Sequence, residues 1–540
     1  MLDLAFVRSP LPHASIIAIN TNVARKAPEV VAVYTAEDLN IPAHHSFMAV
    51  SEACARPPLA VGKVRFVGDI VAAVVATSRA AASDAAELVE VDYDPLPVVV
   101  DPEDALAPGA PAQFDELGTN LAAGIRSAPD DDPLADAEVV VRARIENQRV
   151  AVVPMEGNAI VVLPGAPGDA HELTAYVSAQ NGARMAGADG QVVRPLAPQS
   201  IRVIAPHVDG GFGGKAGIVA EHSIAITAAL TLGQPLKWVE TRSENLIGMP
   251  HGRAQVQYVE LELRQIGYDV AVALTNATPV GAFRGAGRPE ASALLERIMD
   301  MAAVTLDLDP AEIRRRNFLG PEQFPYQTVV GTRYDSGNYA VALDEALRLA
   351  DYPALRAEQA RRRAAGSRTS LGIGLASYVE ITAGGGAREW GSVTVHPDGT
   401  ATASVGTSGH GQGHPTSFAM LVSDKLGIPL ESRPRATAKT PTPGGNRRQS
   451  SPHCRSEAAA RSWRLSTSSN RIRQLRLKRY LYRAQSLDPA CRTGNLRCRC
   501  GDPTNDVRQV TMGASRPTPR HVRLTRSLLS SVRTPDWLSQ

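Results

Sequence analysis

Residues 208–217, VDGGFGGKAG, place four glycines around Phe212, and Lys215 follows them directly. Glycine loses more conformational entropy on ordering than any other residue, so this cluster indicates backbone that must lie where side chains do not fit. The residues before the loop, 201–209, have the pattern of a strand, and residues 221–233 have that of a helix. The loop is therefore predicted to connect a strand to a helix, either as a nest for a flat or anionic ligand or as an ordinary tight turn.

Two common nucleotide-binding loops do not fit these residues. The phosphate-binding pattern GxxxxGK[ST] would need Gly in place of Asp209 and Ser or Thr in place of Ala216. A clean G-x-G-x-x-G after a first strand is also absent. The functional interpretation that remains is a backbone nest.

The charge of the chain is distributed very unevenly. The 540 residues carry a net charge of +2, but residues 433–540 hold 23 Lys and Arg against 5 Asp and Glu, which leaves 34 against 50 in residues 1–432. Four of the five cysteines also lie in the basic tail, and Cys54 is the only one before it. Residues 1–432 therefore cannot supply the cysteines for disulfides or for an iron–sulfur cluster.

Composition and periodicity divide the chain into four parts. Residues 1–105 predict a compact α/β unit, residues 106–133 are acidic and rich in Pro and Gly like a linker, and residues 134–431 alternate strand and helix patterns. Residues 432–540 are rich in Arg, Ser, Pro and Thr and are expected to be disordered. The N-terminus does not resemble a signal peptide and no apolar run is long enough to span a bilayer, so a cytoplasmic location is expected.

Two further glycine-rich segments carry polar side chains. GAFRGAGRPE, residues 281–290, contains two arginines among small residues, which suits recognition of phosphate or of a carbonyl-rich ring but also suits a solvated loop. GTSGHGQGH, residues 406–414, contains Gln412 between two histidines. No carboxylate or cysteine accompanies them, so a ligand-binding amide is favoured over a zinc site.

Two weaker segments precede these. Gln180 and Asn181 end a strand pattern in SAQN, and residues 155–158, MEGN, lead into another. Each of them, taken alone, is typical of plain turn chemistry.

Together and in this order, these segments resemble the large, molybdenum-cofactor-binding subunit of the xanthine dehydrogenase/aldehyde oxidase family, in particular its carbon monoxide dehydrogenase large-subunit-like branch. LAFVRSPLPHASI and VRFVGDIVAAVVA resemble the hammerhead domain of that family. The resemblance covers residues 1–431. It implies a mixed α+β and α/β fold: an N-terminal hammerhead α/β domain in 1–105, an incomplete molybdopterin-binding α+β region in 134–431, and a disordered basic tail.

The resemblance also implies the site residues. A molybdenum–pterin cofactor, with molybdopterin cytosine dinucleotide as one form, holds the metal through the pterin rather than through side chains. Cofactor contacts fall on Gln180, Gly210, Gly211, Phe212, Gly213, Gly214, Arg284, Gly411, Gln412 and Gly413, and the substrate pocket on Phe283, Gly285 and Ala286. Backbone amides and amide side chains can bind the ring atoms and phosphates of such a cofactor without a covalent link.

The implied reaction is hydroxylation of an aldehyde or an N-heterocycle, with water as the oxygen source. True carbon monoxide dehydrogenases hold copper with a cysteine where this chain has Gly285, so carbon monoxide is not the expected substrate. The implied partners are an FAD-binding medium subunit and a [2Fe–2S] small subunit on separate chains, assembled as a dimer of heterotrimers.

The sequence departs from the family pattern in three places that matter. The usual lead-in strand is missing at the start, so the chain is expected to begin late. A segment is missing between YVELELRQ and IGYDVAVALTN, and the final domain, which carries the catalytic glutamate in a GVGE segment, has no counterpart. The tail resembles a frameshifted reading of GC-rich DNA. No catalytic residue is therefore assigned, and the chain as written is expected to be inactive. The alternatives are a non-catalytic remnant and a nucleic-acid-binding protein that uses the basic tail.

Overall fold

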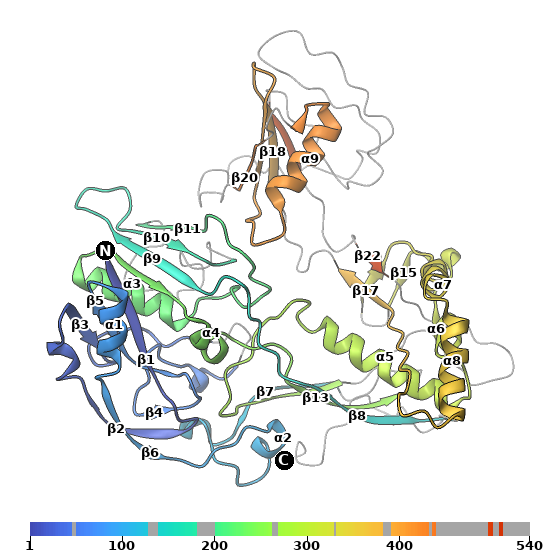
Figure 1. Ribbon diagram of the computed structural model, residues 1–540, viewed down its shortest axis with the longest axis horizontal. Coiled ribbons are helices and arrows are strands. Elements are labelled where there is room, and N and C mark those ends of the chain that lie inside the picture. Colours follow the sequence, from blue (N-terminus) through green and yellow to red (C-terminus); the bar gives the residue numbers. More distant parts are fainter. Residues whose placement is uncertain are drawn as a thin grey trace.

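The computed structural model describes residues 1–45, 50–127, 139–180, 200–261, 268–328, 331–381 and 390–430, together with three short strands of the tail. It confirms the expected mixed fold, with strands and helices alternating along the chain (Figure 1). None of the described helices has the length and apolar composition needed to cross a bilayer.

A seven-stranded sheet forms the centre of the larger body. Its spatial order is β11 (Ile201–Ile204), β10 (Leu173–Val177), β9 (Ala159–Pro164), β12 (Leu236–Val239), β1 (Leu2–Arg8), β5 (Ile70–Ala76) and β3 (Val30–Tyr34). β1 pairs parallel with β12 through Leu2 and Leu236. The N-terminal unit and the predicted molybdopterin-binding region therefore share one sheet.

Two helices cover this sheet, and a smaller sheet completes the N-terminal unit. α1 (Arg79–Ala86) begins after its N-cap Ser78, whose side chain accepts a hydrogen bond from the Ala81 amide. α3 (Ala220–Leu232) ends at Gly233, as its sequence predicts, and packs against β9 and β12. The smaller sheet has the order β4 (Lys63–Val64), β2 (Ala14–Asn20), β6 (Glu90–Pro95).

Part of the range predicted as a linker, 106–133, is structured. After α2 (Pro102–Ala105) and the 3₁₀ turn η3 (Asp115–Leu117), strand β7 (Leu121–Ser127) pairs with β14 (Tyr268–Ala273). The Pro/Gly-rich composition hides this strand because its partner lies far away in the sequence. The side chain of Asn120 orders the entry to β7 by donating to the carbonyls of Ala105 and Pro111, both at 3.0 Å.

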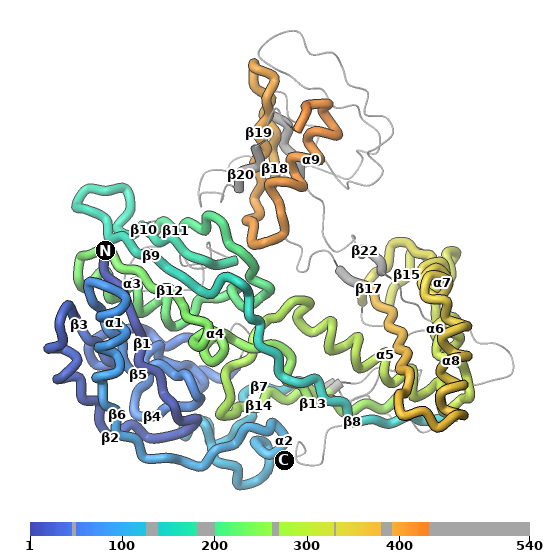
Figure 2. Tube along the Cα trace, viewed as in Figure 1, coloured from blue at the N-terminus to red at the C-terminus, as the bar shows by residue number. Residues whose placement is uncertain are grey.

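A second core forms where α5 (Arg288–Thr305) packs on a two-stranded ribbon. Figure 2 shows β8 (Val141–Asn147) and β13 (Gln255–Leu261), which are distant in sequence, running side by side below this helix. Alternate ribbon residues such as Val141, Ile145 and Val259 share a buried cluster with Ile298 of the helix. The ribbon and α5 form one packing unit.

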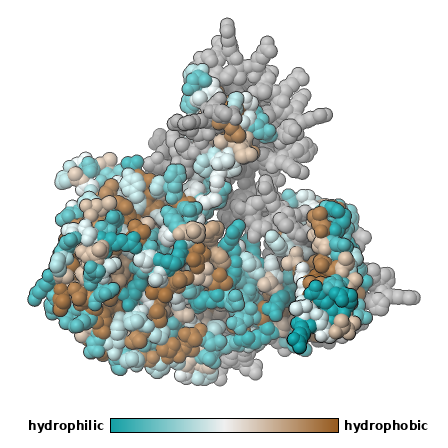
Figure 3. Space-filling view, in the orientation of Figure 1, coloured by the Kyte–Doolittle hydropathy of each residue, from teal (hydrophilic) through white to brown (hydrophobic). Residues whose placement is uncertain are grey.

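The remaining elements form two smaller groups. One contains α6 (Pro310–Asn317), η6 (Pro321–Gln323), β15 (Tyr326–Gln327), β16 (Arg333–Tyr334), α7 (Tyr339–Leu349), α8 (Tyr352–Ala364) and β17 (Tyr378–Ile381). The other contains β18 (Trp390–Val395), β19 (Ala401–Val405) and α9 (His414–Leu426). Figure 3 shows apolar and polar side chains interspersed over the visible described surface.

The tail expected to be disordered, 432–540, lies mostly outside the described residues. Within it the structure describes three strands, β20 (Arg435–Ala438), β21 (Asn495–Arg499) and β22 (Val507–Val510). They pair with β19, β18 and β17, respectively. Binding of nucleic acid by the tail stays a hypothesis.

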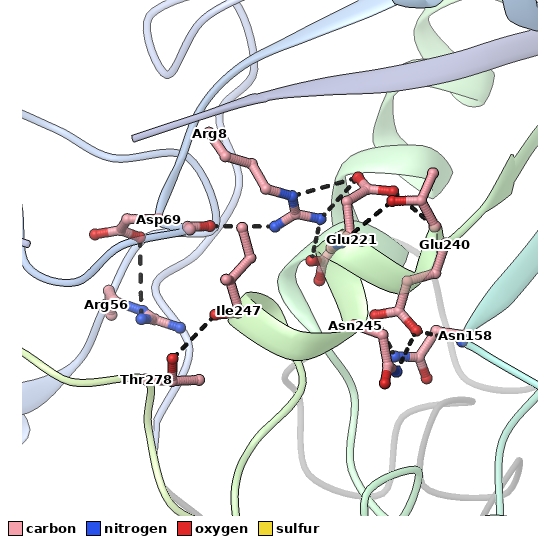
Figure 4. Close-up of polar contacts among 12 residues, drawn as sticks. Arg8, Arg56, Asp69, Asn158, Glu221, Glu240, Asn245, Ile247 and Thr278 are labelled. Atoms are coloured by element: carbon pink, nitrogen blue, oxygen red, sulfur yellow. Dashed lines mark hydrogen bonds and ion pairs between the residues drawn. The ribbon is translucent and has the colours of Figure 1, made fainter. Parts of the chain in front are cut away.

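A buried arginine joins β1 to two helices of the second region. The Arg8 guanidinium donates to Glu221 at 2.8 Å and to Glu244 at 3.1 Å, and also to the carbonyl of Gly68 at 3.2 Å (Figure 4). Glu221 belongs to α3 and Glu244 to α4 (Arg242–Gly248). The Arg8 side chain is only 8% exposed, so these partners, rather than water, stabilise its positive charge.

We expect Arg8→Met to lower the free energy of unfolding by about 3–5 kcal/mol, because two carboxylates would then lie buried without their cation. Arg25→Met is the matched control, since the Arg25–Asp38 pair is largely exposed and should be worth less than about 1 kcal/mol. Urea unfolding of both variants measures the difference. Equal destabilisation by the two substitutions would contradict the assigned role of Arg8.

Two histidines, the half-buried His44 and the buried His222, predict a loss of stability in mild acid. Burial lowers the pKa of His44 and that of His222 to about 4 in each case, although Glu221 acts in the opposite direction. An unfolded histidine has a pKa of about 6.5, so the unfolded state binds more protons between these values. Each histidine therefore contributes stability that is present above a pH of about 6.5, and about 2 kcal/mol of it is lost by a pH of about 5.

The variant His222→Leu tests this prediction by urea unfolding at a pH of about 7 and a pH of about 5. We expect the variant to lose about 2 kcal/mol less than the wild type between the two pH values. His207→Leu, which replaces an exposed histidine, is the control variant. If His222→Leu lost as much stability between the two pH values as the wild type does, His222 could not be the source of that loss.

Candidate functional site

The glycine-rich segment Gly210–Gly214 (the glycine loop) lies directly against Gln180. The Gly213 amide donates to Gln180 Oε1 at 2.8 Å. The backbone amide of Gln180 in turn donates to the carbonyl of Lys215 at 2.9 Å. A Cβ atom on Gly211 would lie 2.4 Å from the Gln180 side chain, so a larger residue at this position would displace that side chain.

Residues 281–287 (the arginine loop) pack on the other side of the glycine loop. The Arg284 amide donates to the carbonyl of Phe212 at 2.8 Å. The Arg284 guanidinium lies 5.6 Å from the centre of the Phe212 ring, within range of a cation–π contact. A Cβ on Gly213 would stand 2.5 Å from the Ala282 carbonyl oxygen, so this contact also requires glycine.

The third predicted segment, Gly411–Gly413 (the GQG loop), reaches the same place. A Cβ on Gly411 would lie 3.2 Å from the Gly210 nitrogen, and Ser408 Oγ donates to the Gln180 carbonyl at 3.2 Å. The Gln412 side chain accepts from the His410 amide at 2.7 Å and so folds back on its own loop. Gly413, with φ of +74°, is the N-cap of α9.

The structure thus brings together the segments that hold every predicted site residue. Phe283, Gly285 and Ala286 lie in the arginine loop beside Arg284, and Gly285 packs so closely on Pro289 that a Cβ would be 2.5 Å from Pro289 Cδ. Asn181 lies outside the described residues. Contact of these residues with a cofactor or a substrate stays a prediction.

A buried ion pair behind the glycine loop was not predicted. The Lys215 side chain is fully buried, and its Nζ lies 3.0 Å from Glu156 Oε2 and 2.8 Å from Ser178 Oγ. The same carboxylate oxygen accepts from the Asp209 amide at 2.7 Å. Glu156 therefore binds the residues that flank the glycine loop, Asp209 and Lys215, through a single carboxylate oxygen.

The pKa shifts of this pair have opposing causes. Partial burial acts to raise the pKa of Glu156, but the hydrogen bonds from Lys215, Asp209 and Ser178 outweigh it, and the pKa falls below its usual range. Burial lowers the pKa of Lys215, and the contact with Glu156 offsets this only in part. The MEGN turn and the lysine after the glycines were both visible in the sequence, but no spacing rule connects residues 59 positions apart.

The donors at the site suit an anionic, planar ligand. The backbone amides of Gly210, Gly211 and Phe212 donate to none of the described residues, and neither do those of the GQG loop. The Arg284 side chain is exposed and forms no ion pair with a described carboxylate, and the Phe212 ring is 40% exposed. Such amides, a guanidinium and an aromatic face are suited to a ligand that combines negative charge with a flat ring.

A cavity of about 370 Å³ lies elsewhere, between β1, α1 and the start of α4. Arg79, Trp238 and Glu244 are among the residues that line it, and none of the predicted site residues is. Within the described part of the chain, no three His, Cys, Asp or Glu side chains are arranged to hold a metal ion. The candidate site is therefore defined by the contacts among the converging loops and not by this cavity.

Comparison with protein families gives three matches. Residues 1–97 match the aldehyde oxidase and xanthine dehydrogenase a/b hammerhead domain. Residues 114–267 and 261–318 match one molybdopterin cofactor-binding domain, and residues 345–446 match a second. The second of these extends past residue 431, the predicted end of the resemblance.

Individual relatives agree with these matches. The carbon monoxide dehydrogenase large chain of Hydrogenophaga pseudoflava is 35% identical, over 80% of this chain and 62% of its own length. The nicotine 6-hydroxylase large subunit of Paenarthrobacter nicotinovorans is 32% identical, over 80% of this chain and 59% of its own length. The chain therefore spans less than two thirds of these relatives.

Solved structures share the fold. The Cu,Mo-CO dehydrogenase superposes with a TM-score of 0.74 and 30% identity, over 82% of this chain and 65% of the other. Quinoline 2-oxidoreductase from Pseudomonas putida 86 superposes with a TM-score of 0.73 and 29% identity, over 81% of this chain and 63% of the other.

We expect Gly213→Ala to destabilise the chain by at least about 2 kcal/mol, because its φ of +98° is strained for alanine and the new methyl would collide with the Ala282 carbonyl. Gly217→Ala is the matched control, since a Cβ there meets no atom within 4 Å. Urea unfolding compares the two variants. A Gly213→Ala protein as stable as the control would show that the two loops do not pack as closely as described.

Proposed function

This chain belongs to the xanthine dehydrogenase/aldehyde oxidase family, and we propose that it is the molybdenum-cofactor-binding large subunit of a hydroxylase. The observation that carries the proposal is the convergence of Gln180, the glycine loop, the arginine loop and the GQG loop around backbone amides that have no partner among the described residues. The family matches to two molybdopterin cofactor-binding domains support the same conclusion.

The residues of the site have distinct roles in this proposal. When bound, the molybdenum cofactor supplies transfer of oxygen from water and takes up the electrons released by the substrate. The amides of Gly210, Gly211 and Phe212 and those of the GQG loop would bind its polar edges, while the Gln180 side chain fixes the glycine loop through the Gly213 amide. Arg284 presents a cation, and the exposed ring of Phe212 presents a flat apolar surface, to the space that substrate would enter.

We propose an N-heterocycle or an aldehyde as substrate rather than carbon monoxide. Gly285 has no side chain with which to hold a copper ion. Two relatives are named for oxidation of nicotine and quinoline, both N-heterocycles. A planar heteroaromatic ring also suits the exposed aromatic surface of Phe212.

The proposed assembly follows the family. The names "large chain" and "large subunit" of two relatives support further subunits, which we propose to be an FAD-binding medium subunit and a [2Fe–2S] small subunit, in a cytoplasmic dimer of heterotrimers. The proposed cofactor form is molybdopterin cytosine dinucleotide. The proposed domains are 1–105, with the hammerhead fold, and 134–431, with the cofactor.

Molybdenum content tests the proposal directly. We expect the full chain, expressed in cells supplied with molybdate, to copurify with molybdenum and a fluorescent pterin, and we expect Gln180→Ala to lose most of both, because its side chain holds the glycine loop. Gln234→Ala, on an exposed turn, should retain them. A wild-type chain without molybdenum would overturn the proposal. Substrate-dependent turnover by the purified 540-residue chain would instead contradict the separate expectation that it is inactive.

A further inference from the structure

The two terminal nitrogens of the Arg253 guanidinium (the fork) bind the backbone of the arginine loop, and this contact is the grip of Arg253 on the loop. Arg253 Nη1 donates to the Phe283 carbonyl at 3.0 Å, and its Nη2 donates to the Arg284 carbonyl at 2.9 Å. The same guanidinium lies 4.8 Å from the centre of the Phe283 ring. Two successive carbonyls and one ring of the loop are therefore held by a single side chain, which is only 13% exposed.

The far side of the fork is anchored in the second core. Arg253 Nη1 also lies 3.4 Å from Glu290 Oε1, and Glu290 is buried in the first turn of α5. The fork thus connects the arginine loop to the helix that follows it. An arginine suits this task because its donors lie in a rigid plane, whereas a lysine ammonium is a point charge that cannot satisfy the same geometry.

The backbone that carries Arg253 is held in an uncommon conformation. Arg253 and Ala254 have φ of +63° and +59°, in the left-handed region that favours glycine. Hydrogen bonds fix the residues just before them, since Gly252 exchanges bonds with Val150 and His251 bonds to Pro279. Non-glycine residues keep such strained conformations only where the surrounding structure imposes them, and they cluster at functional sites.

The grip extends from Arg253 to the glycine loop. The Arg284 residue whose carbonyl is held by Arg253 donates its own amide to the Phe212 carbonyl at 2.8 Å. A Cβ on Gly252 would lie 2.3 Å from Phe283 Cβ, so the segment and the loop are in close contact. A continuous series of contacts therefore runs from Glu290 through Arg253 and Arg284 to Phe212.

We propose that Arg253 is a positioning residue that sets the arginine loop, and through it the Arg284 side chain and the Phe212 ring that face the substrate. The importance of that face rests on the proposed function. The grip itself does not, because it is a property of the folded chain. The alternative is that Arg253 does no more than form a buried ion pair with Glu290.

Hydrogen exchange of the full chain, read by mass spectrometry, tests the grip. The amides of Arg284 and Ala286 report on the loop because they donate to Phe212 and Phe283. In Arg253→Gly, which adopts a φ of +63° without strain, we expect these amides to exchange at least about tenfold faster. In Arg253→Lys these amides should exchange nearly as fast as in Arg253→Gly, because the charge beside Glu290 is kept but the fork is lost.

Chemical rescue separates positioning from general destabilisation. Millimolar methylguanidinium should restore slow exchange of the loop in Arg253→Gly, and the same concentration of methylammonium should not. Arg142→Met is the matched control, since Arg142 pairs with Glu260 on the neighbouring ribbon and should leave the loop unchanged. Wild-type exchange in Arg253→Gly, or full protection in Arg253→Lys, would overturn the proposal.

Molybdenum content, measured on the same samples, keeps the two proposals apart. A wild-type chain that holds no molybdenum but shows the exchange pattern above would overturn the proposed function and leave the grip standing. If the chain holds molybdenum but exchange in the arginine loop does not change on substitution of Arg253, the proposed function stands and the positioning role of Arg253 is overturned.

Discussion

The close approach of backbone to its neighbours at the glycine loop is the constraint on which the rest of the site depends. Gly211 packs on the Gln180 side chain, Gly213 on the Ala282 carbonyl, and Gly411 on Gly210. A Cβ at Gly211, Gly213 or Gly411 would require its neighbours to move. The glycines therefore allow four chain segments to meet at one place, where the amides of Gly210, Gly211 and Phe212 donate to none of the described residues.

The seven-stranded sheet is what brings these segments within reach of each other. β10 ends just before Gln180, β11 leads toward the glycine loop, and both belong to the same sheet as the N-terminal strands β1, β5 and β3. The N-terminal unit is thus part of the platform rather than an appendage. Arg8 adds to this by placing a buried cation between β1 and the two helices that flank β12.

The segments of the candidate site could be predicted from sequence because the motifs that carry the family resemblance are local. Glycine clusters such as 210–214 and 411–413 are contiguous, and their conformational meaning can be read without knowing any partner. The contacts of Lys215 with Glu156, and of Arg253 with Phe283, could not be predicted in this way, because each joins segments that only the fold brings together. Strand β7 was missed for the same reason, since its pattern is weak and its partner β14 is distant.

The buried cations share a physical logic that the surface arginines lack. Lys215 and Arg253 both lie behind a loop, each contacts a carboxylate, and each also bonds to a second polar group that belongs to another segment. Burying a charge costs free energy unless its partners are correctly placed. A buried cation therefore disfavours any arrangement of the loops that separates it from these partners. Glycine makes the close approach of the loops possible but adds flexibility. The buried cations behind them supply the restraint, and a site built from backbone amides needs both.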